Sequence, residues 1–196
     1  MKTLKQLKLV LGSLIVMAFA IQTTLAQTYQ LNNGISKLKV EGTSNIHDWE
    51  VVAEKQQGKL LAEVEDGKLT KIQQLDFVVT AESLKSGKSG MDKNTYKALK
   101  TDKNKQITFK LTKVQHIECG ATNSCKVNAS GNLTIAGKTN PIDIVFDVKI
   151  YGTKIIFVGS KTLKMTDFGI DPPKAVFGTI TTGDDIVVKF ESSFLK

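Results

Sequence analysis

The chain has 196 residues, of which 41% are hydrophobic, and its 27 Lys or Arg and 19 Asp or Glu residues give a formal net charge of +8 at pH 7. Basic and acidic residues are interspersed, as in Lys37, Lys39 and Glu41, which is typical of a solvated surface and disfavours a nucleic-acid-binding stripe. A chain of this length can bury a substantial core as one domain.

Residues 1–26 have the pattern of a secretory signal peptide. Lysines precede an apolar run from Leu9 to Ile21, and small residues follow at Thr24 and Ala26. The run is shorter than the roughly 20 residues that a membrane span requires, and no second such run follows. We therefore predict cleavage before Gln27, a domain over residues 27–196 without a transmembrane segment, and a location in the periplasm or outside the cell.

The segment 42–49 reads Gly-Thr-Ser-Asn-Ile-His-Asp-Trp and opens a run of alternating apolar and polar residues. In a strand His47 and Asp48 point to opposite faces, which argues against a catalytic pair. His47 shares its face with Trp49 and Val51. A structural histidine is the favoured interpretation, a contact to a ligand head group is the second, and catalysis or metal binding is the third.

Similar alternation recurs along the rest of the chain and predicts half-buried strands. The clearest runs cover residues 60–64, 75–81, 107–111, 142–150 and 186–194, and glycine-containing turns separate such runs at short intervals. Short links favour antiparallel neighbours, so we expect an all-β chain. The pattern alone allows either two packed sheets or one sheet closed on itself.

One short helix is predicted near residues 91–100, where apolar side chains fall on one side. Ser89 and Asp92 resemble a capping box at its start. Further along, residues 167–178 are expected to form a loop that crosses one end of the sheet through an Asp-Pro-Pro turn.

Cys119 and Cys125 are the only cysteines, and they flank a turn-forming sequence between two strand-like runs. In an exported protein this arrangement predicts a disulfide. A redox-active pair would have two intervening residues, so that alternative is less favoured.

No motif in the sequence predicts an enzyme. His116 is the only other histidine, and neither histidine has a second ligand at a recognised metal-binding spacing. Residues 131–139 and 87–89 lack a glycine that a phosphate-binding loop requires. No serine lies in a nucleophile elbow. The sequence therefore predicts no catalytic residue, no metal and no cofactor.

The order of several segments resembles the YceI-like, polyisoprenoid-binding protein family over about residues 30–194. These segments are Gly42–Trp49, Met91–Lys100, the Ile-Thr-Phe of 107–109, the Gly-Asn-Leu-Thr-Ile-Ala-Gly-Lys-Thr of 131–139, and the Asp-Phe-Gly-Ile of 167–170. The resemblance implies an antiparallel, eight-stranded, lipocalin-like β-barrel whose apolar interior holds a long isoprenoid, quinone or fatty acyl lipid. It implies export and no enzymatic activity. Asn104-Lys105-Gln106, where a proline often precedes the Ile-Thr-Phe strand, and the cysteine hairpin depart from the family pattern.

The apolar wall of such a barrel would set the affinity for the lipid tail, and polar groups at the mouth, His47 among them, would orient the head group. Two alternatives stay open: a secreted structural or interaction domain with a filled core, and an enzyme that acts on a small lipid through His47 and a carboxylate. The oligomeric state also stays open, a dimer included. The predicted wall residues are Trp49, Val51, Phe77, Val79, Ile107, Phe109, Ile144, Phe146, Val148, Val188 and Phe190.

Overall fold

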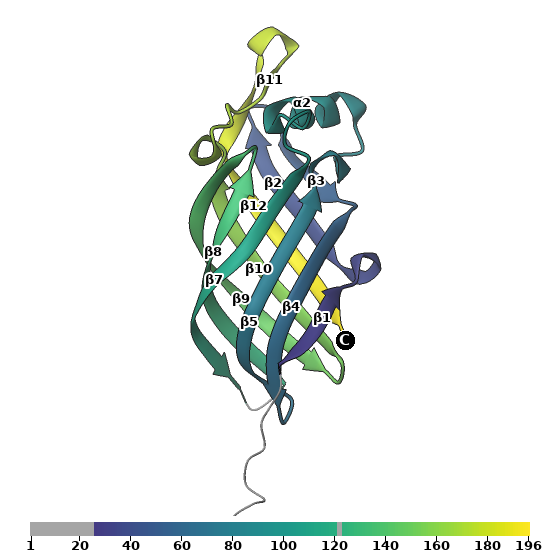
Figure 1. The fold of residues 1–196 in the computed structure, drawn as a ribbon. Coiled ribbons are helices and arrows are strands. Elements are labelled where there is room, and N and C mark those ends of the chain that lie inside the picture. Colours follow the sequence, from purple (N-terminus) through teal and green to yellow (C-terminus); the bar gives the residue numbers. More distant parts are fainter. Residues whose placement is uncertain (1–25, 121–122) are drawn as a thin grey trace, which may run out of the picture.

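The computed structural model describes residues 26–120 and 123–196 as one closed sheet with a helix at one end (Figure 1). The predicted signal peptide lies outside the described residues, except for its last residue, Ala26.

Eight antiparallel strands form a ring, in which each strand pairs with the next along the path. The ring closes because β1 pairs with β4 on one side and with β12 on the other. The eight strands are β1 (Gln27–Leu31), β4 (Gln56–Glu65), β5 (Lys68–Thr80), β7 (Gln106–Cys119), β8 (Ser124–Ile135), β9 (Lys138–Tyr151), β10 (Lys154–Lys164) and β12 (Ile180–Leu195). The expected all-β, lipocalin-like architecture is confirmed, and the choice between two sheets and one closed sheet is settled in favour of closure.

Three shorter strands complete the end of the ring that carries the helix. β2 (Lys37–Ser44) follows β1 after the single 3-10 turn η1 (Asn33–Ile35), and it takes over the pairing with β12. β3 (Asp48–Ala53) pairs with β2 and with β6 (Leu84–Lys85). The side chain of Asn33 fixes the break between β1 and β2, because its Nδ2 donates to the Glu54 carbonyl at 2.9 Å and its Oδ1 accepts from the Gln56 amide at 2.8 Å.

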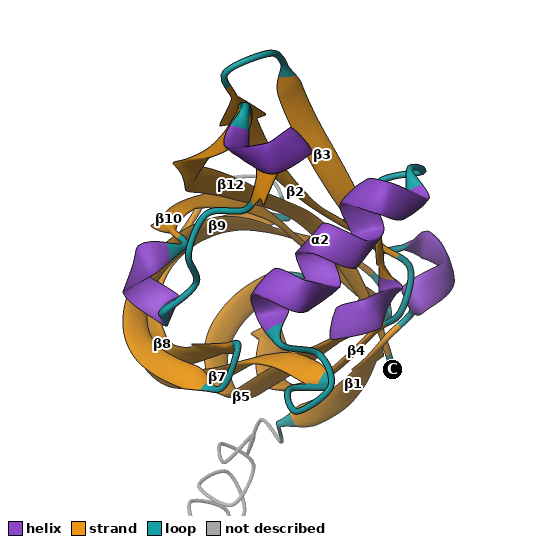
Figure 2. Ribbon diagram, turned by 90° about the horizontal axis from the view of Figure 1, so that it is seen from above, coloured by secondary structure: helices purple, strands orange, loops and turns teal. Residues whose placement is uncertain are grey.

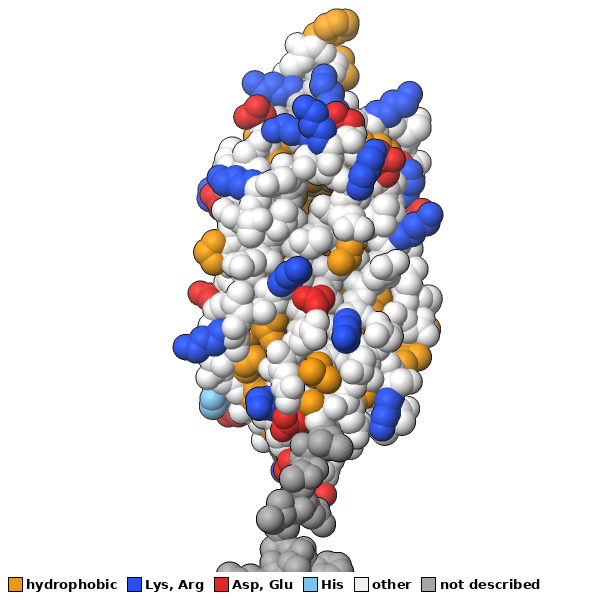
Figure 3. All heavy atoms as spheres, viewed as in Figure 1, with side chains coloured by type: hydrophobic (Ala, Val, Ile, Leu, Met, Phe, Trp, Pro, Cys, Tyr) orange, Lys and Arg blue, Asp and Glu red, His pale blue; other side chains and the backbone are white. Residues whose placement is uncertain are grey.

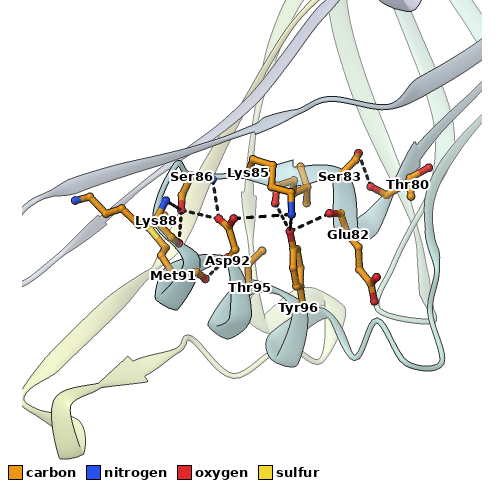
Figure 4. A network of polar contacts seen from close by, with 11 residues as sticks. Thr80, Glu82, Ser83, Lys85, Ser86, Lys88, Met91, Asp92, Thr95 and Tyr96 are labelled. Atoms are coloured by element: carbon orange, nitrogen blue, oxygen red, sulfur yellow. Dashed lines mark hydrogen bonds and ion pairs between the residues drawn. The ribbon is translucent and has the colours of Figure 1, made fainter.

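The helix α2 (Ser89–Leu99) lies across one end of the ring (Figure 2). It ends where Lys100 adopts a left-handed conformation with φ 53°. The predicted capping box is wrong: Ser89 is the first residue of the helix and Lys88 precedes it without a side-chain cap. Asp92 instead accepts hydrogen bonds from the Ser86 hydroxyl at 2.6 Å and the Ser86 amide at 2.8 Å, which lower the pKa of the Asp92 carboxyl (Figure 4).

Tyr96 attaches α2 to the strand end beneath it. Its hydroxyl lies 2.9 Å from the Glu82 carbonyl, in η2 (Ala81–Ser83), and 3.0 Å from the Leu84 carbonyl in β6 (Figure 4). Because the helix is joined to the sheet through these polar contacts, its apolar residues Met91, Ala98 and Leu99 face the interior of the ring.

The segment between β10 and β12 also crosses the helix end of the ring, as expected for residues 167–178. It contains the 3-10 turn η3 (Thr166–Phe168), the short strand β11 (Lys174–Ala175) and a second turn η4 (Val176–Gly178). Phe168 and Ile170 of this segment are buried against the strands.

Inward-facing side chains form two hydrophobic clusters, one at each end of the ring. The cluster far from α2 is tightly filled; Leu60, Val127, Val148, Ile155 and Phe194 are 0% exposed there. We call this half of the ring the filled end. The predicted disulfide is confirmed at this end: Cys119 and Cys125 lie opposite each other on β7 and β8 and are bonded, with an S–S distance of 2.02 Å.

Candidate ligand-binding cavity

A cavity of about 790 Å³ occupies the half of the ring next to α2. Its volume falls within the roughly 300–1,000 Å³ of typical small-molecule sites. Phe146, Phe157 and Phe194 form its floor, where it meets the filled end. α2 contributes Met91, Thr95 and Ala98 to the opposite end, which we call the mouth.

The predicted wall residues face this cavity, with one exception. Trp49, Val51, Phe77, Val79, Ile107, Phe109, Ile144, Phe146, Val188 and Phe190 all line it. Val148 also points into the ring, but it lies in the filled end, is 0% exposed, and is not among the lining residues. Alternation identifies the inward face of a strand, whereas the position along the barrel axis decides whether a side chain meets open space or packed neighbours.

Two strand glycines make room for aromatic side chains of the wall. A Cβ atom at Gly131 would lie 2.2 Å from Cζ of Phe109, and one at Gly159 would lie 2.6 Å from Cζ of Phe190. Because glycine has no side chain, each ring lies directly against the backbone of the neighbouring strand. The rings therefore stay close to the wall and leave the cavity open.

A third glycine explains the first and last residues of the segment 42–49. Gly42 on β2 is directly opposite Trp49 on β3, and a Cβ atom at Gly42 would lie 2.2 Å from Cζ2 of the indole. The indole Nε1 donates a hydrogen bond of 3.0 Å to the Thr43 carbonyl. The only tryptophan is therefore held flat against the rim of the barrel while its ring also lines the cavity.

The residues between Gly42 and Trp49 build the turn that joins β2 to β3. The Ser44 hydroxyl donates to the His47 carbonyl at 2.7 Å and accepts from the His47 amide at 3.2 Å. The Asn45 side chain donates to the Thr179 carbonyl and accepts from the Thr181 amide, each at 2.9 Å. The turn is thus joined to the start of β12, the strand next to β2.

His47 is exposed and lines the mouth of the cavity. Its Nδ1 lies 2.8 Å from the backbone oxygen of Asp48, a contact that fits an Nδ1–H tautomer. The imidazole therefore contacts the main chain of Asp48 and not its carboxylate, while the ring borders the cavity where a ligand head group would lie.

Four lysines line the cavity, and sequence reasoning did not single them out. Lys88, Lys93 and Lys174 lie at the mouth, and Lys161 is half-buried on β10, on the inward face between Gly159 and Leu163. The alternation of residues along β10 could have identified Lys161 as an inward-facing side chain. No ion pair involves these four lysines within the described residues, and the described part of the lining includes no aspartate or glutamate. The mouth is therefore positively charged.

The described residues include no group of three or more His, Cys, Asp or Glu side chains able to hold a metal ion. In the same part of the chain, no helix combines the length and the apolar character needed to cross a membrane.

Comparison with known proteins identifies the family. The YceI-like domain model matches residues 21–194. The chain belongs to the YceI-like family. Comparison with curated protein sequences gave no match.

Solved structures of low sequence identity share the fold of this YceI-like chain. BcnA of Burkholderia cenocepacia is 17% identical with a TM-score of 0.66, over 83% of this chain and 98% of its own. A polyisoprenoid binding domain from Saccharophagus degradans, implicated in plant cell wall breakdown, is 13% identical with a TM-score of 0.66, over 85% of this chain and 97% of its own. The Campylobacter jejuni YceI protein is 20% identical with a TM-score of 0.55, over 72% and 84%.

Proposed function

We propose that this YceI-like chain is an exported, non-catalytic carrier or sequestering protein that holds one long-chain lipid of the isoprenoid type in its cavity. The observation that carries the proposal is the predominantly apolar wall around about 790 Å³ of open space, with His47 and three lysines at the mouth. Membership of the YceI-like family, and a fold shared with a polyisoprenoid binding domain, support it.

The geometry matches the energetics of a lipid tail. Each methylene removed from water contributes about 0.8 kcal/mol, so an extended tail gains more from the wall than a few polar contacts can supply. The tail would lie along the wall towards the phenylalanine floor, and the head group would lie at the mouth near His47 and the lysines. A structural domain with a filled core would need side chains packed as tightly at the helix end of the ring as they are at the filled end. An enzyme that uses His47 would need a carboxylate beside this residue at the mouth.

The proposal is tested by mass spectrometry of the lipid released by organic solvent from the native protein. We expect an isoprenoid, quinone or fatty acyl species in a ratio of about one per chain. Repeated preparations that release no lipid, together with no uptake of an added isoprenoid, would overturn the proposal.

Two neighbouring valines on β12 give a matched pair of variants for this experiment. Val188 lines the cavity, whereas Val187 is absent from the lining and, as its neighbour in a strand, points to the opposite face. Val188→Trp should fill the cavity and lower the amount of bound lipid, while Val187→Trp should leave it unchanged. Equal lipid content in the two folded variants would place the lipid elsewhere.

A further inference from the structure

A hairpin at the mouth carries the most exposed apolar side chains that the structure describes. It runs from β11 through η4 into the start of β12, and Lys174 pairs with Thr181 across it. At its tip the exposed fraction is 62% for Val176 and 110% for Phe177. The hairpin projects beyond α2 at the end of the barrel (Figure 1), and its tip is hydrophobic (Figure 3).

The conformation of this tip is unfavourable in water for two reasons. Its aromatic and branched side chains pack in neither hydrophobic cluster. Val176 and Phe177 also both have positive φ, 50° and 53°, a region that costs energy for residues other than glycine and asparagine. Such exposure and strain together are typical of a surface that meets a partner.

The hairpin is nevertheless held firmly to the barrel. The Thr182 amide donates to the Pro173 carbonyl at 3.2 Å across its base, and the Asn45 side chain bonds both Thr179 and Thr181. Asn45 is followed by Ile46, which is itself 57% exposed. Ile46, Val176 and Phe177 are thus exposed apolar side chains on two hydrogen-bonded segments at the mouth, and we call these three residues the hydrophobic tip.

Positive charge accompanies the hydrophobic tip. Lys88, Lys93 and Lys174, which we call the mouth lysines, line the cavity opening and form no ion pair with any described residue. Two acidic residues at the same end are paired with lysines, Glu82 with Lys105 and Asp185 with Lys164, whereas Asp48 and Asp171 form no ion pair with a described residue. Lysine side chains lie around this end below the tip (Figure 3).

We propose that the hydrophobic tip inserts into the interfacial region of a lipid bilayer that contains anionic phospholipids, with the mouth lysines on the phosphate groups. Apolar side chains flanked by lysines are what such an interface binds, because one group enters the acyl boundary and the other remains at the head groups. Docking in this way turns the cavity mouth to the membrane. Lipid would then pass between bilayer and cavity without crossing water, a step that rests on the proposed function, whereas docking itself does not.

Docking is tested by flotation of the full chain with vesicles of phosphatidylcholine alone or mixed with phosphatidylglycerol. We expect binding to the mixed vesicles that weakens as salt is added. Phe177→Ser should weaken binding by about tenfold or more, the loss expected for withdrawing one aromatic side chain from the apolar phase. Phe177 has no packing contacts in either cluster, so this variant should retain the thermal unfolding midpoint of the native chain.

Tyr151 provides the matched control, because it is 57% exposed as the last residue of β9, at the filled end. Tyr151→Ser should bind vesicles like the native chain. Equal binding of Phe177→Ser and the native chain, an equal loss in Tyr151→Ser, or no preference for phosphatidylglycerol would overturn the proposal.

Docking and lipid binding fail separately. Phe177 does not line the cavity, so Phe177→Ser should still yield the co-purifying lipid. Vesicle binding without any extractable lipid would leave docking standing and refute the carrier function, and extractable lipid without vesicle binding would do the reverse.

Discussion

Replacing Gly42 with alanine should destabilise the barrel, although the change adds a single methyl group to a strand. The added Cβ would lie 2.2 Å from Cζ2 and 2.6 Å from Cε2 of the Trp49 indole, so the ring has to leave its present position. That movement breaks the hydrogen bond from Nε1 to the Thr43 carbonyl, which contributes about 0.5–1.5 kcal/mol. It also forces the side chain off its rotamer at a cost of roughly 0.5–1.5 kcal/mol.

The expected loss is therefore about 1–3 kcal/mol in the free energy of unfolding, in line with the cost of overpacking a well-packed site. The assay is urea denaturation followed by circular dichroism, with Trp49 fluorescence as a second probe of the rim. Since the displaced indole can turn towards the cavity that it lines, the folded variant should also retain less lipid than the native chain.

Gly90→Ala is the matched control, because the same methyl group at this position in α2 would meet nothing within 4 Å. Alanine there should stabilise the chain by about 0.4–1 kcal/mol, since it restricts the unfolded state. A Gly42→Ala variant as stable as the native chain, with an unchanged fluorescence spectrum, would refute the interpretation of segment 42–49 as a packing motif.

Three further predictions concern the cavity, the disulfide and acid stability. Lys161→Met should reduce the affinity for a long-chain fatty acid relative to the matching alcohol by about tenfold, as for the loss of one charged hydrogen bond; equal affinities in titration calorimetry before and after the change would contradict a role for Lys161 at the head group. Replacing Cys119 and Cys125 with serine should lower the free energy of unfolding by about 2 kcal/mol, because the bridge closes a short loop, and lipid content should not change, since neither residue lines the cavity. Hydrogen bonds from Thr166 lower the pKa of the Asp184 carboxyl. The ionised carboxylate therefore stabilises the fold at pH values above the unfolded-state pKa of about 3.9, and this stabilisation is lost as the pH falls through the lower folded-state pKa. Stability of the native chain should thus fall more steeply with acid below that value than stability of Asp184→Asn, and parallel pH profiles would count against this contribution.

Local signals in the sequence misplaced the start of α2. Ser89 and Asp92 have the spacing of a capping box, yet Asp92 bonds Ser86 in the preceding loop. The reason is tertiary: the loop after β6 folds back on the first turn of the helix and supplies donors that the spacing rule does not consider. For Lys161 the local signal was right, because the alternation of β10 places this residue on the inward face. A lysine is not expected in a packed core, and the structure accommodates it because the side chain lines an open cavity.

Segment 42–49 illustrates how far a sequence motif identifies chemistry. The adjacent histidine, aspartate and tryptophan suggest a reactive site. The sequence placed His47 in a strand, whereas it lies in the turn before β3, where its Nδ1 contacts the main chain of Asp48. The fold uses Gly42, Ser44 and Asn45 to build the rim. His47 lines the mouth of the cavity, where a ligand head group would lie.

The sequence by itself determined which side chains face inward and that the fold is antiparallel and all-β, because both depend on local spacing, and the order of short motifs indicated the family. It predicted a disulfide between Cys119 and Cys125, which the structure confirmed. Alternation left open whether the sheet closes on itself; the family resemblance predicted closure, and the structure confirmed it. Only the tertiary structure decided that Val148 meets packed neighbours while Val188 meets open space, and that Phe177 lies in solvent at the mouth. The alternation of apolar and polar residues shows which face of a strand a side chain lies on, but it does not show which side chains or open space lie opposite that face. The volume of the cavity and the exposure of the hydrophobic tip depend on residues brought together from distant strands and loops.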